Sequence, residues 1–411
     1  MKLSYIILCC CLIFGNAERI YSQSLDSLIQ EAYDNNIELQ ILEKQYQSRL
    51  QVVLQIAPRP DPELGIGLYP LPVETRLGTQ LSRISAIQML PQKGMVEAQK
   101  GLAAAKAQPI IEQINAQKLE LAYQVKMAWL QVYELDKSRV VMQRNLQILE
   151  SLENLALVKV ETGKASPADV LMVQLQIQNL KNEILVLKKL REKPLADLKS
   201  ILNRPALIDI EITDSLTFAT LMYQKDSLLN IVKDHHPTLK LIELQQEVAK
   251  HTILVNTLKE KPTFGIGLDY MTVFSRQDAD PIGNGRDIVQ LRGTVKIPLY
   301  KDQYEAKRQE ERLKIEALEL QKQNTAEQYW AIIDKAYTDY ETDKLRLDLY
   351  EQQIATTRTA IDFLKGAYSV NGQKFEELLR LEKAITDYDL MILKAIVNSH
   401  QAKVLIDKFL K

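Results

Sequence analysis

The sequence predicts a mainly α-helical chain that carries two pairs of β-strands and is built twice from one helix–strand–strand–long helix–helix unit. Three observations predict this fold class. Two stretches, 110–162 and 299–365, contain neither glycine nor proline. Segments that precede each stretch alternate between apolar and polar residues. The tetrapeptide Gly-Ile-Gly-Leu occurs at 65–68 and again at 265–268, in a chain of 411 residues with only 14 glycines.

Residues 1–22 are predicted to be a secretory signal peptide. Lys2 gives a positive start, residues 4–14 form a short apolar run, and small residues follow it. We expect cleavage after Ser22, with Ala17 as the alternative. The three cysteines lie in the apolar run, so the mature chain is expected to form no disulfide. A large residue, leucine, precedes the first cysteine, which argues against a lipid anchor.

The remainder of the chain is predicted to be a duplication. When the sequence is shifted by 200 positions, 13 of the 43 positions from Asp26 to Leu68 are identical, without a gap. The first repeat spans 23–222, with a strand pair at about 62–90 and a helical hairpin whose turn lies near 163. The second repeat spans 223–411, with a strand pair at about 262–299 and a turn near 372.

Helices are expected to dominate each repeat. Apolar residues recur every three or four positions, as at Leu149 and Leu152, and Gln, Glu and Lys fill the remaining faces. The helix predicted over 94–162 is about 100 Å long. Shorter helices, predicted over 167–202 and 237–261, have a combined length that nearly matches it. On the helices alone, an ordinary long coiled coil is an equally good interpretation.

The strands favour a different interpretation. At 287–299 the apolar residues share one face and most polar residues share the other, and 263–274 alternates in the same way. The strand within 76–90 alternates less well, because Arg83 falls on the face of Leu81 and Ile87. Strands of ~9–13 residues flanked by such long helices fit transmembrane β-strands, with an apolar outside and a polar lumen.

Closure of a barrel requires more than one copy of the chain. Four strands cannot close, and open edges in lipid leave backbone groups without hydrogen bonds. Two copies supply eight strands, and side chains fill the interior of an eight-stranded barrel. Three copies supply twelve strands. The residues predicted to face the lumen are small or polar: Gly65, Gly67, Gly265, Gly267, Asp269, Gln290, Arg292 and Lys296.

Taken together, these features resemble the TolC family of outer-membrane efflux channels. The resemblance rests on the duplicated unit, on Met89-Leu90-Pro91 and Ile297-Pro298-Leu299 before each long helix, and on the segment ETGKASPADVLMVQ at 161–174. It implies a homotrimer with a twelve-stranded barrel in the outer membrane and a periplasmic tunnel of helices. It also implies a periplasmic adaptor (membrane fusion) protein and an inner-membrane pump as partners, with the channel as a passive, gated conduit.

The same resemblance assigns the two glycine turns to the periplasmic tip, where adaptors dock. The candidate docking residues are Gly163, Lys164, Ser166, Val170, Leu171, Gly372, Lys374, Leu378 and Leu379. Asp169, Glu376 and Glu377 are candidates for a gate or a selectivity ring. The alternative role of these acids is to stabilise helix N-termini; the two roles are equally favoured for Asp169, and the alternative is favoured for the glutamates.

Nothing in the sequence indicates catalysis, a cofactor or a metal site. The adjacent residues His235 and His236 point apart on a helix, so capping is favoured over metal binding. The net charge of −1 gives no support for nucleic-acid binding. We therefore expect an outer-membrane channel for small molecules or ions in a tripartite efflux or type I secretion system. The alternative is a periplasmic coiled-coil structural or adaptor protein without a barrel.

Overall fold

The computed structural model describes residues 24–371 and 373–410, apart from positions 205–209, 211, 213–214, 226, 229–230 and 233–235. The predicted signal peptide, His235 and Gly372 lie outside the described residues. The described part of the chain is mainly helical, with four strands, as predicted.

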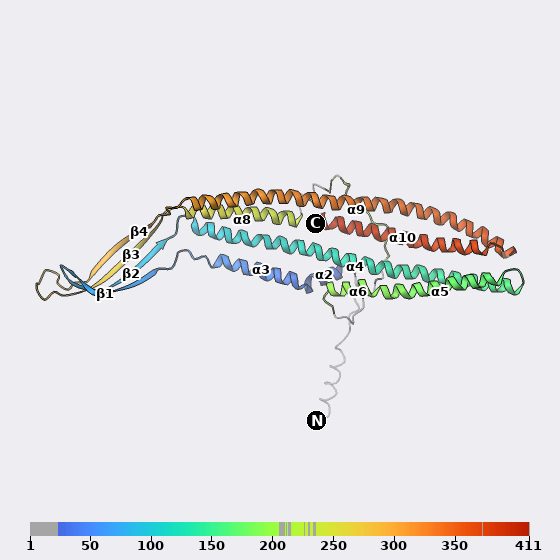
Figure 1. Cartoon of the computed structure of the whole chain (residues 1–411), viewed down its shortest axis with the longest axis horizontal. Coiled ribbons are helices and arrows are strands. Elements are labelled where there is room, and N and C mark those ends of the chain that lie inside the picture. The colour runs from blue at the N-terminus through green and yellow to red at the C-terminus, as the bar shows by residue number, and fades with distance from the viewer. Residues whose placement is uncertain are drawn as a thin grey trace, which may run out of the picture. The chain divides into compact units, whose positions relative to one another are not determined.

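Both halves of the chain show the same order of elements (Figure 1). The first half contains α2 (Leu25–Asn35), α3 (Ile37–Leu54), β1 (Glu63–Thr75), β2 (Gly78–Leu90), α4 (Met95–Glu161), α5 (Pro167–Leu190) and α6 (Glu192–Ile201). The second half contains α8 (Pro237–Lys259), β3 (Thr263–Phe274), β4 (Ile288–Lys296), α9 (Asp302–Asn371) and α10 (Phe375–Leu410).

The chain forms two compact units, and each unit draws on both halves of the sequence. The strand unit comprises Glu38–Ala116 and Lys233–Gln328 and contains the four strands. The helical unit comprises the residues up to Ile37 together with Gln117–Val232 and Tyr329–Lys411. Among the described residues, no helix is both long enough and apolar enough to cross a membrane.

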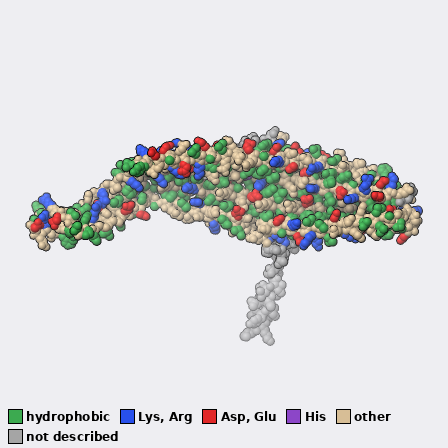
Figure 2. All heavy atoms as spheres, in the orientation of Figure 1, with side chains coloured by type: hydrophobic (Ala, Val, Ile, Leu, Met, Phe, Trp, Pro, Cys, Tyr) green, Lys and Arg blue, Asp and Glu red, His purple; other side chains and the backbone are tan. Residues whose placement is uncertain are grey.

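In the strand unit, the two strand pairs join into one antiparallel sheet of order β1-β2-β3-β4. The central pairing, β2 with β3, links the two repeats, and Ile84 lies opposite Tyr270 in it. Strands β1 and β4 are the edges, and among the residues that the structure describes neither has a partner on its outer side. Figure 2 shows hydrophobic side chains gathered along the strands.

In the helical unit, α4, α5, α9 and α10 share one core near the two helix turns. Each helix contributes buried apolar side chains to it: Leu149, Leu152, Ala156, Val170, Val173, Ile177, Leu180, Ile361, Tyr368, Phe375, Leu378 and Leu379. These residues recur at helical spacing, so each helix presents one apolar stripe. The core fixes the two turns next to one another.

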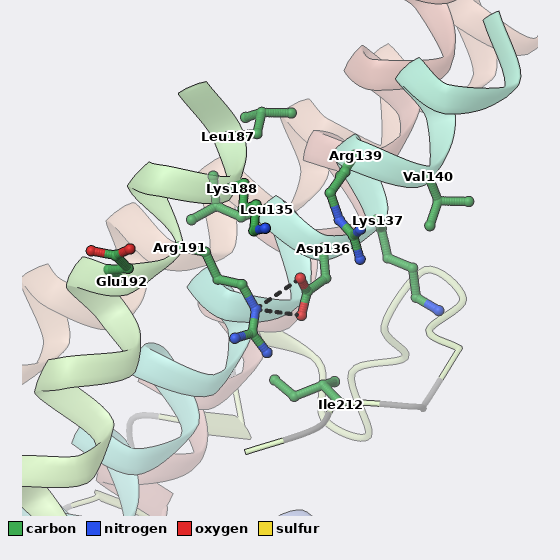
Figure 3. A pocket seen from close by; sticks show the side chains of 10 residues that line it. All are labelled: Leu135, Asp136, Lys137, Arg139, Val140, Leu187, Lys188, Arg191, Glu192 and Ile212. Atoms are coloured by element: carbon green, nitrogen blue, oxygen red, sulfur yellow. Dashed lines mark hydrogen bonds and ion pairs between the residues drawn. The ribbon is translucent and has the colours of Figure 1, made fainter. Parts of the chain in front are cut away.

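The segment 167–202 forms two helices rather than the single helix expected. The break lies at Arg191, which separates α5 from α6. Pro194 has no N–H to bond the carbonyl of Leu190, so the helical hydrogen-bond ladder cannot continue. The Arg191 Nε donates to both carboxylate oxygens of Asp136 at 2.9 and 3.1 Å, which ties the junction to α4 (Figure 3).

The second strand pair is also shorter than expected. β4 ends at Lys296, so Ile297 and Leu299 lie beyond the sheet. Pro298 cannot donate a ladder hydrogen bond, which ends the strand just before it.

Candidate functional site

The register of the sheet places all eight residues predicted to face the lumen on one face. Gly65, Ser85, Asp269 and Gln290 lie side by side across the four strands. Two residues further along these strands, Gly267 lies opposite Arg292. The remaining predicted residues lie at alternate positions of the same strands, and alternate positions of a strand share a face. We refer to this surface as the polar face.

Arg83, which the sequence did not place, belongs to the polar face and pairs with Asp269. Its Nη2 donates to Asp269 Oδ2 at 2.8 Å, and Arg292 Nε donates to the same oxygen at 3.0 Å. A further hydrogen bond joins Arg292 Nη2 to Asp269 Oδ1. The carboxylate is fully buried beneath two partly exposed guanidinium groups. One negative and two positive charges leave this cluster with a net positive charge.

Three glycines of the polar face, Gly65, Gly265 and Gly267, lie close to atoms of neighbouring strands. A Cβ on Gly265 would lie 2.5 Å from Met89 Sδ, and one on Gly65 would lie 2.7 Å from Ser85 Oγ. On Gly267 it would lie 3.2 Å from both Ala86 O and Ile87 Cγ1. Cross-strand neighbours therefore occupy the space beside these three glycines.

The opposite face of the sheet is apolar and exposed. Its large apolar side chains, which are 40–80 % exposed, are Leu64, Ile66, Leu68, Ile84, Phe264, Ile266, Leu268, Tyr270, Phe274, Val289, Leu291 and Val295. A contiguous apolar surface of this kind marks contact with another protein or with a membrane. The sheet thus combines an apolar face, a polar face and two unpaired edges.

The first helix turn has the geometry that its sequence predicts. Gly163 has a φ of +70°, and hydrogen bonds from Gly163 N to Val160 O (3.0 Å) and from Lys164 N to Lys159 O (2.9 Å) close the end of α4. This pattern is a Schellman motif, which favours glycine. Ser166 caps α5, since its Oγ accepts a hydrogen bond from Ala168 N at 3.2 Å.

The second turn is built differently. Lys374 has a φ of +69°, unusual for a residue with a side chain. Its ammonium lies 3.8 Å from the carboxylate of Glu377. Glu376 and Glu377 are exposed in the first turn of α10, where negative charge is favourable.

Asp169 and Tyr368 connect the two turns. Tyr368, on α9, is fully buried. Its hydroxyl approaches the Asp169 carboxylate without reaching hydrogen-bond geometry. Burial first, and then the charge of Asp169, raises the pKa of Tyr368 to about 12. Burial also raises the pKa of Asp169, while contacts with the Ser166 backbone and with Tyr368 oppose that rise.

Tyr368 was not among the residues selected from the sequence. The sequence does indicate that Tyr368 is buried, because it lies four residues after Leu364 and seven after Ile361, on the apolar stripe of α9. That spacing indicates burial, but it does not show that the hydroxyl meets an acid from another helix.

Three of the predicted docking residues lie in the helical core and not on the surface. Val170, Leu378 and Leu379 are buried in the core shared by the four helices. They cannot contact a partner unless these helices separate. Lys164, Ser166 and Lys374 are exposed, and so is Leu171.

The histidine prediction is confirmed for the residue that the structure describes. His236 caps α8, with its Nδ1 accepting a hydrogen bond from Thr238 N at 3.1 Å. Within the described part of the chain, no group of three or more His, Cys, Asp and Glu side chains could hold a metal ion.

Comparison with known proteins assigns the fold. No family model and no curated protein matches the sequence. Three solved structures each match 94 % of this chain. CusC matches with a TM-score of 0.70 and 14 % identity over 91 % of its own chain. VceC of Vibrio cholerae has a TM-score of 0.69 and 13 % identity over 95 % of its chain, and MtrE of Neisseria gonorrhoeae has a TM-score of 0.68 and 15 % identity over 88 %. These are TolC-family outer-membrane channels. The chain has the TolC fold. At these identities the likeness concerns the fold, and the resemblance found in the sequence is confirmed at that level.

Proposed function

We propose that this TolC-fold chain is the outer-membrane channel of an export system, in which three copies close a twelve-stranded barrel. It is a passive, gated conduit for small molecules or ions, with the helices forming a periplasmic tunnel. An inner-membrane pump and a periplasmic adaptor are its partners. Support comes from the sheet itself and from the fold of the matched channels.

The sheet is the observation that carries this proposal. Apolar side chains on a face exposed to water are costly, at roughly 25 cal/mol for each Å². Lipid removes that cost on one face, and a water-filled lumen suits the Arg83–Asp269–Arg292 cluster on the other. The edges β1 and β4 then pair with neighbouring copies, as closure in a membrane requires.

Single-channel recording tests the proposal. Signal-cleaved protein, purified in detergent, is expected to give discrete conductance steps in planar bilayers and to migrate as a heat-sensitive oligomer. The competing function, a periplasmic coiled coil without a barrel, predicts a monomer that is soluble without detergent and gives no conductance. The exposed apolar face disfavours this competitor.

We place the gate at the turns, where Asp169 and Tyr368 tie α5 to α9. The two residues come from different hairpins, so separation of the hairpins separates them. Exposed Lys164 and Lys374 flank this contact and remain candidates for adaptor docking. An adaptor that draws the hairpins apart would also expose Val170, Leu378 and Leu379.

Alkaline pH is expected to loosen this contact. Because the folded-state pKa of Tyr368 is raised from 10 to about 12, its contribution to stability is complete below pH 10 and is lost as pH rises toward 12. The measurement is the melting temperature between pH 8 and pH 12, compared with that of Tyr368→Phe, whose curve lacks this component. Other lysines and tyrosines titrate equally in both proteins. An equal fall in melting temperature in the two proteins would therefore contradict the role given to Tyr368.

Charge reversal at Asp169 tests its role in selectivity. In Asp169→Lys, three lysines replace three carboxylates in the trimer, and the ratio of cation to anion permeability is expected to fall severalfold. Reversal potentials in a salt gradient measure this ratio. Glu183→Lys is the control, because Glu183 is an exposed acid further along α5. Unchanged selectivity in Asp169→Lys would assign Asp169 to helix capping alone.

A further inference from the structure

The strand unit contains a cavity of about 960 Å³ where its helices meet the ends of the strands. Residues of α3, α4 and α8 line it together with residues from all four strands. Met89, Thr263, Thr294 and Lys296 belong to its lining and lie on the polar face of the sheet. The cavity therefore opens on the side that carries the Arg83–Asp269–Arg292 cluster.

The charges around this cavity are almost all positive. The lining contains five cations, Arg49, Arg59, Lys106, Lys259 and Lys296, and a single carboxylate, Glu63. Within the described residues, none of the five cations has a carboxylate at ion-pair distance. Other cations of the strand unit are neutralised, as Arg308 is by Glu260 and Lys322 by Glu243. A concave surface lined by one sign of charge concentrates solutes of the opposite sign.

The lining also contains apolar side chains, which we call the apolar floor. They include Val52, Ile56, Met89, Leu90, Met95 and Val255. Methionine side chains adapt to ligands of different shape. Ligand pockets typically measure about 300–1,000 Å³ and combine an apolar lining with a few polar groups, so this cavity has the size and character to hold an organic molecule rather than a simple ion.

We propose that this cavity binds amphipathic organic anions during their passage through the channel. The cations hold the acidic group and the apolar floor takes the hydrocarbon body. Arg292 and Arg83 continue the positive surface along the polar face, so an anion that leaves the cavity meets the same sign of charge further on. This inference rests on the proposed channel function, and it assigns a class of cargo to that function.

The test compares three probes with the same aromatic body: pyrenebutyrate, uncharged pyrenebutanol and cationic pyrenebutylamine. Each is added to the channel in planar bilayers of zwitterionic lipid, and the concentration that blocks half of the current is measured. Pyrenebutyrate is expected to block at a concentration roughly tenfold or more below the other two. Inorganic sulfate, which has the charge without the apolar body, is expected not to block at these concentrations.

Neutralised variants locate the site. The triple variant Arg49→Gln, Lys106→Gln and Lys259→Gln is expected to raise the half-blocking concentration of pyrenebutyrate about tenfold. The control variant, Lys314→Gln, Lys335→Gln and Lys344→Gln, removes the same charge from exposed sites on α9 and is expected to leave it unchanged. Lys106→Gln alone, at an exposed helical position, is expected to shift it in the same direction and serves if the triple variant does not assemble.

The outcomes separate this inference from the proposed function. A conducting channel that pyrenebutyrate blocks equally in all variants, or that all three probes block equally, overturns the anion site and leaves the channel intact. Block by sulfate as strong as block by pyrenebutyrate also overturns it, because the apolar floor then has no role. Absence of conductance contradicts the proposed channel function instead.

Discussion

Leu291→Arg is expected to abolish assembly of the channel in the membrane, whereas Gln290→Arg, at the adjacent position, is expected to leave it intact. Leu291 lies near the middle of β4 on the apolar face and is 80 % exposed. Arginine at the midplane of a barrel's lipid-facing surface costs about 2–4 kcal/mol, and a trimer bears that cost three times. Gln290 points to the polar face, where a further arginine meets water.

The measurement is the fraction of heat-sensitive trimer in the outer-membrane fraction for each variant. This pair also separates the two candidate functions. In a water-soluble coiled coil, replacing an exposed leucine by arginine changes stability by about 0.5 kcal/mol at most. Equal assembly of the two variants would therefore contradict the membrane location of the sheet.

Gly78→Ala is expected to destabilise the sheet by about 3 kcal/mol or more. Gly78 begins β2 with a φ of +130°, and a Cβ there would lie only 1.8 Å from the carbonyl oxygen of Phe274 on β3. That atom belongs to the backbone of a paired strand and cannot move away without breaking the β2–β3 pairing. The hairpin between β1 and β2 would open with it.

Gly94→Ala is the matched control for this prediction. Gly94 also has a positive φ, +79°, but a Cβ there meets nothing within 4 Å. Its substitution is expected to cost only about 1–2 kcal/mol. Thermal unfolding of the detergent-purified proteins compares the two, and a melting temperature of Gly78→Ala equal to that of Gly94→Ala would refute the steric explanation.

The polar face could be predicted from the sequence because side chains alternate with a period of two in a regular strand. In β3 and β4 the strands pair without a shift in register, so the alternation seen in the sequence is the alternation of the two faces. Arg83 could not be placed because the apolar residues Ile87 and Met89 share its face of β2, so apolar and polar residues are not separated by face in this strand. Only the pairing with β3, where Ser85 lies opposite Asp269, reveals which face Arg83 joins.

The first helix turn was equally predictable, since Gly163 and Ser166 act through local backbone geometry. The second turn was less so, because Lys374 adopts a conformation that its side chain disfavours. Leu378 is buried because α10 packs against three other helices. The approach of Tyr368 to Asp169 likewise requires α9 to lie beside α5. Such tertiary contacts leave only a spacing in the sequence, which does not name the partner.

The same reasoning explains the glycines. Their repetition led to the predicted duplication, and the register places them on one face. Their role in admitting Ser85 and Met89 depended on strand pairing, within one hairpin for Gly65 and Ser85 and between distant strands for Gly265 and Met89. A sequence pattern therefore located the residues, and the register was needed to explain them.

Closure of the sheet by other copies is the central claim, and cysteine cross-linking between its two edges tests it most directly. The double variant Ile66→Cys and Val289→Cys places one thiol on β1 and one on β4, in the same row across the sheet. Within one chain the two lie roughly 14 Å apart, three strand spacings of about 4.8 Å, too far for a disulfide. The native cysteines all fall within the predicted signal peptide.

A short bis-maleimide linker, which tolerates a modest offset in register, is applied to this variant in membranes and the products are separated under denaturing conditions. The account predicts covalent dimers and trimers, with the series ending at three copies. Monomers alone, a series that ends at two, or one that continues beyond three would contradict it.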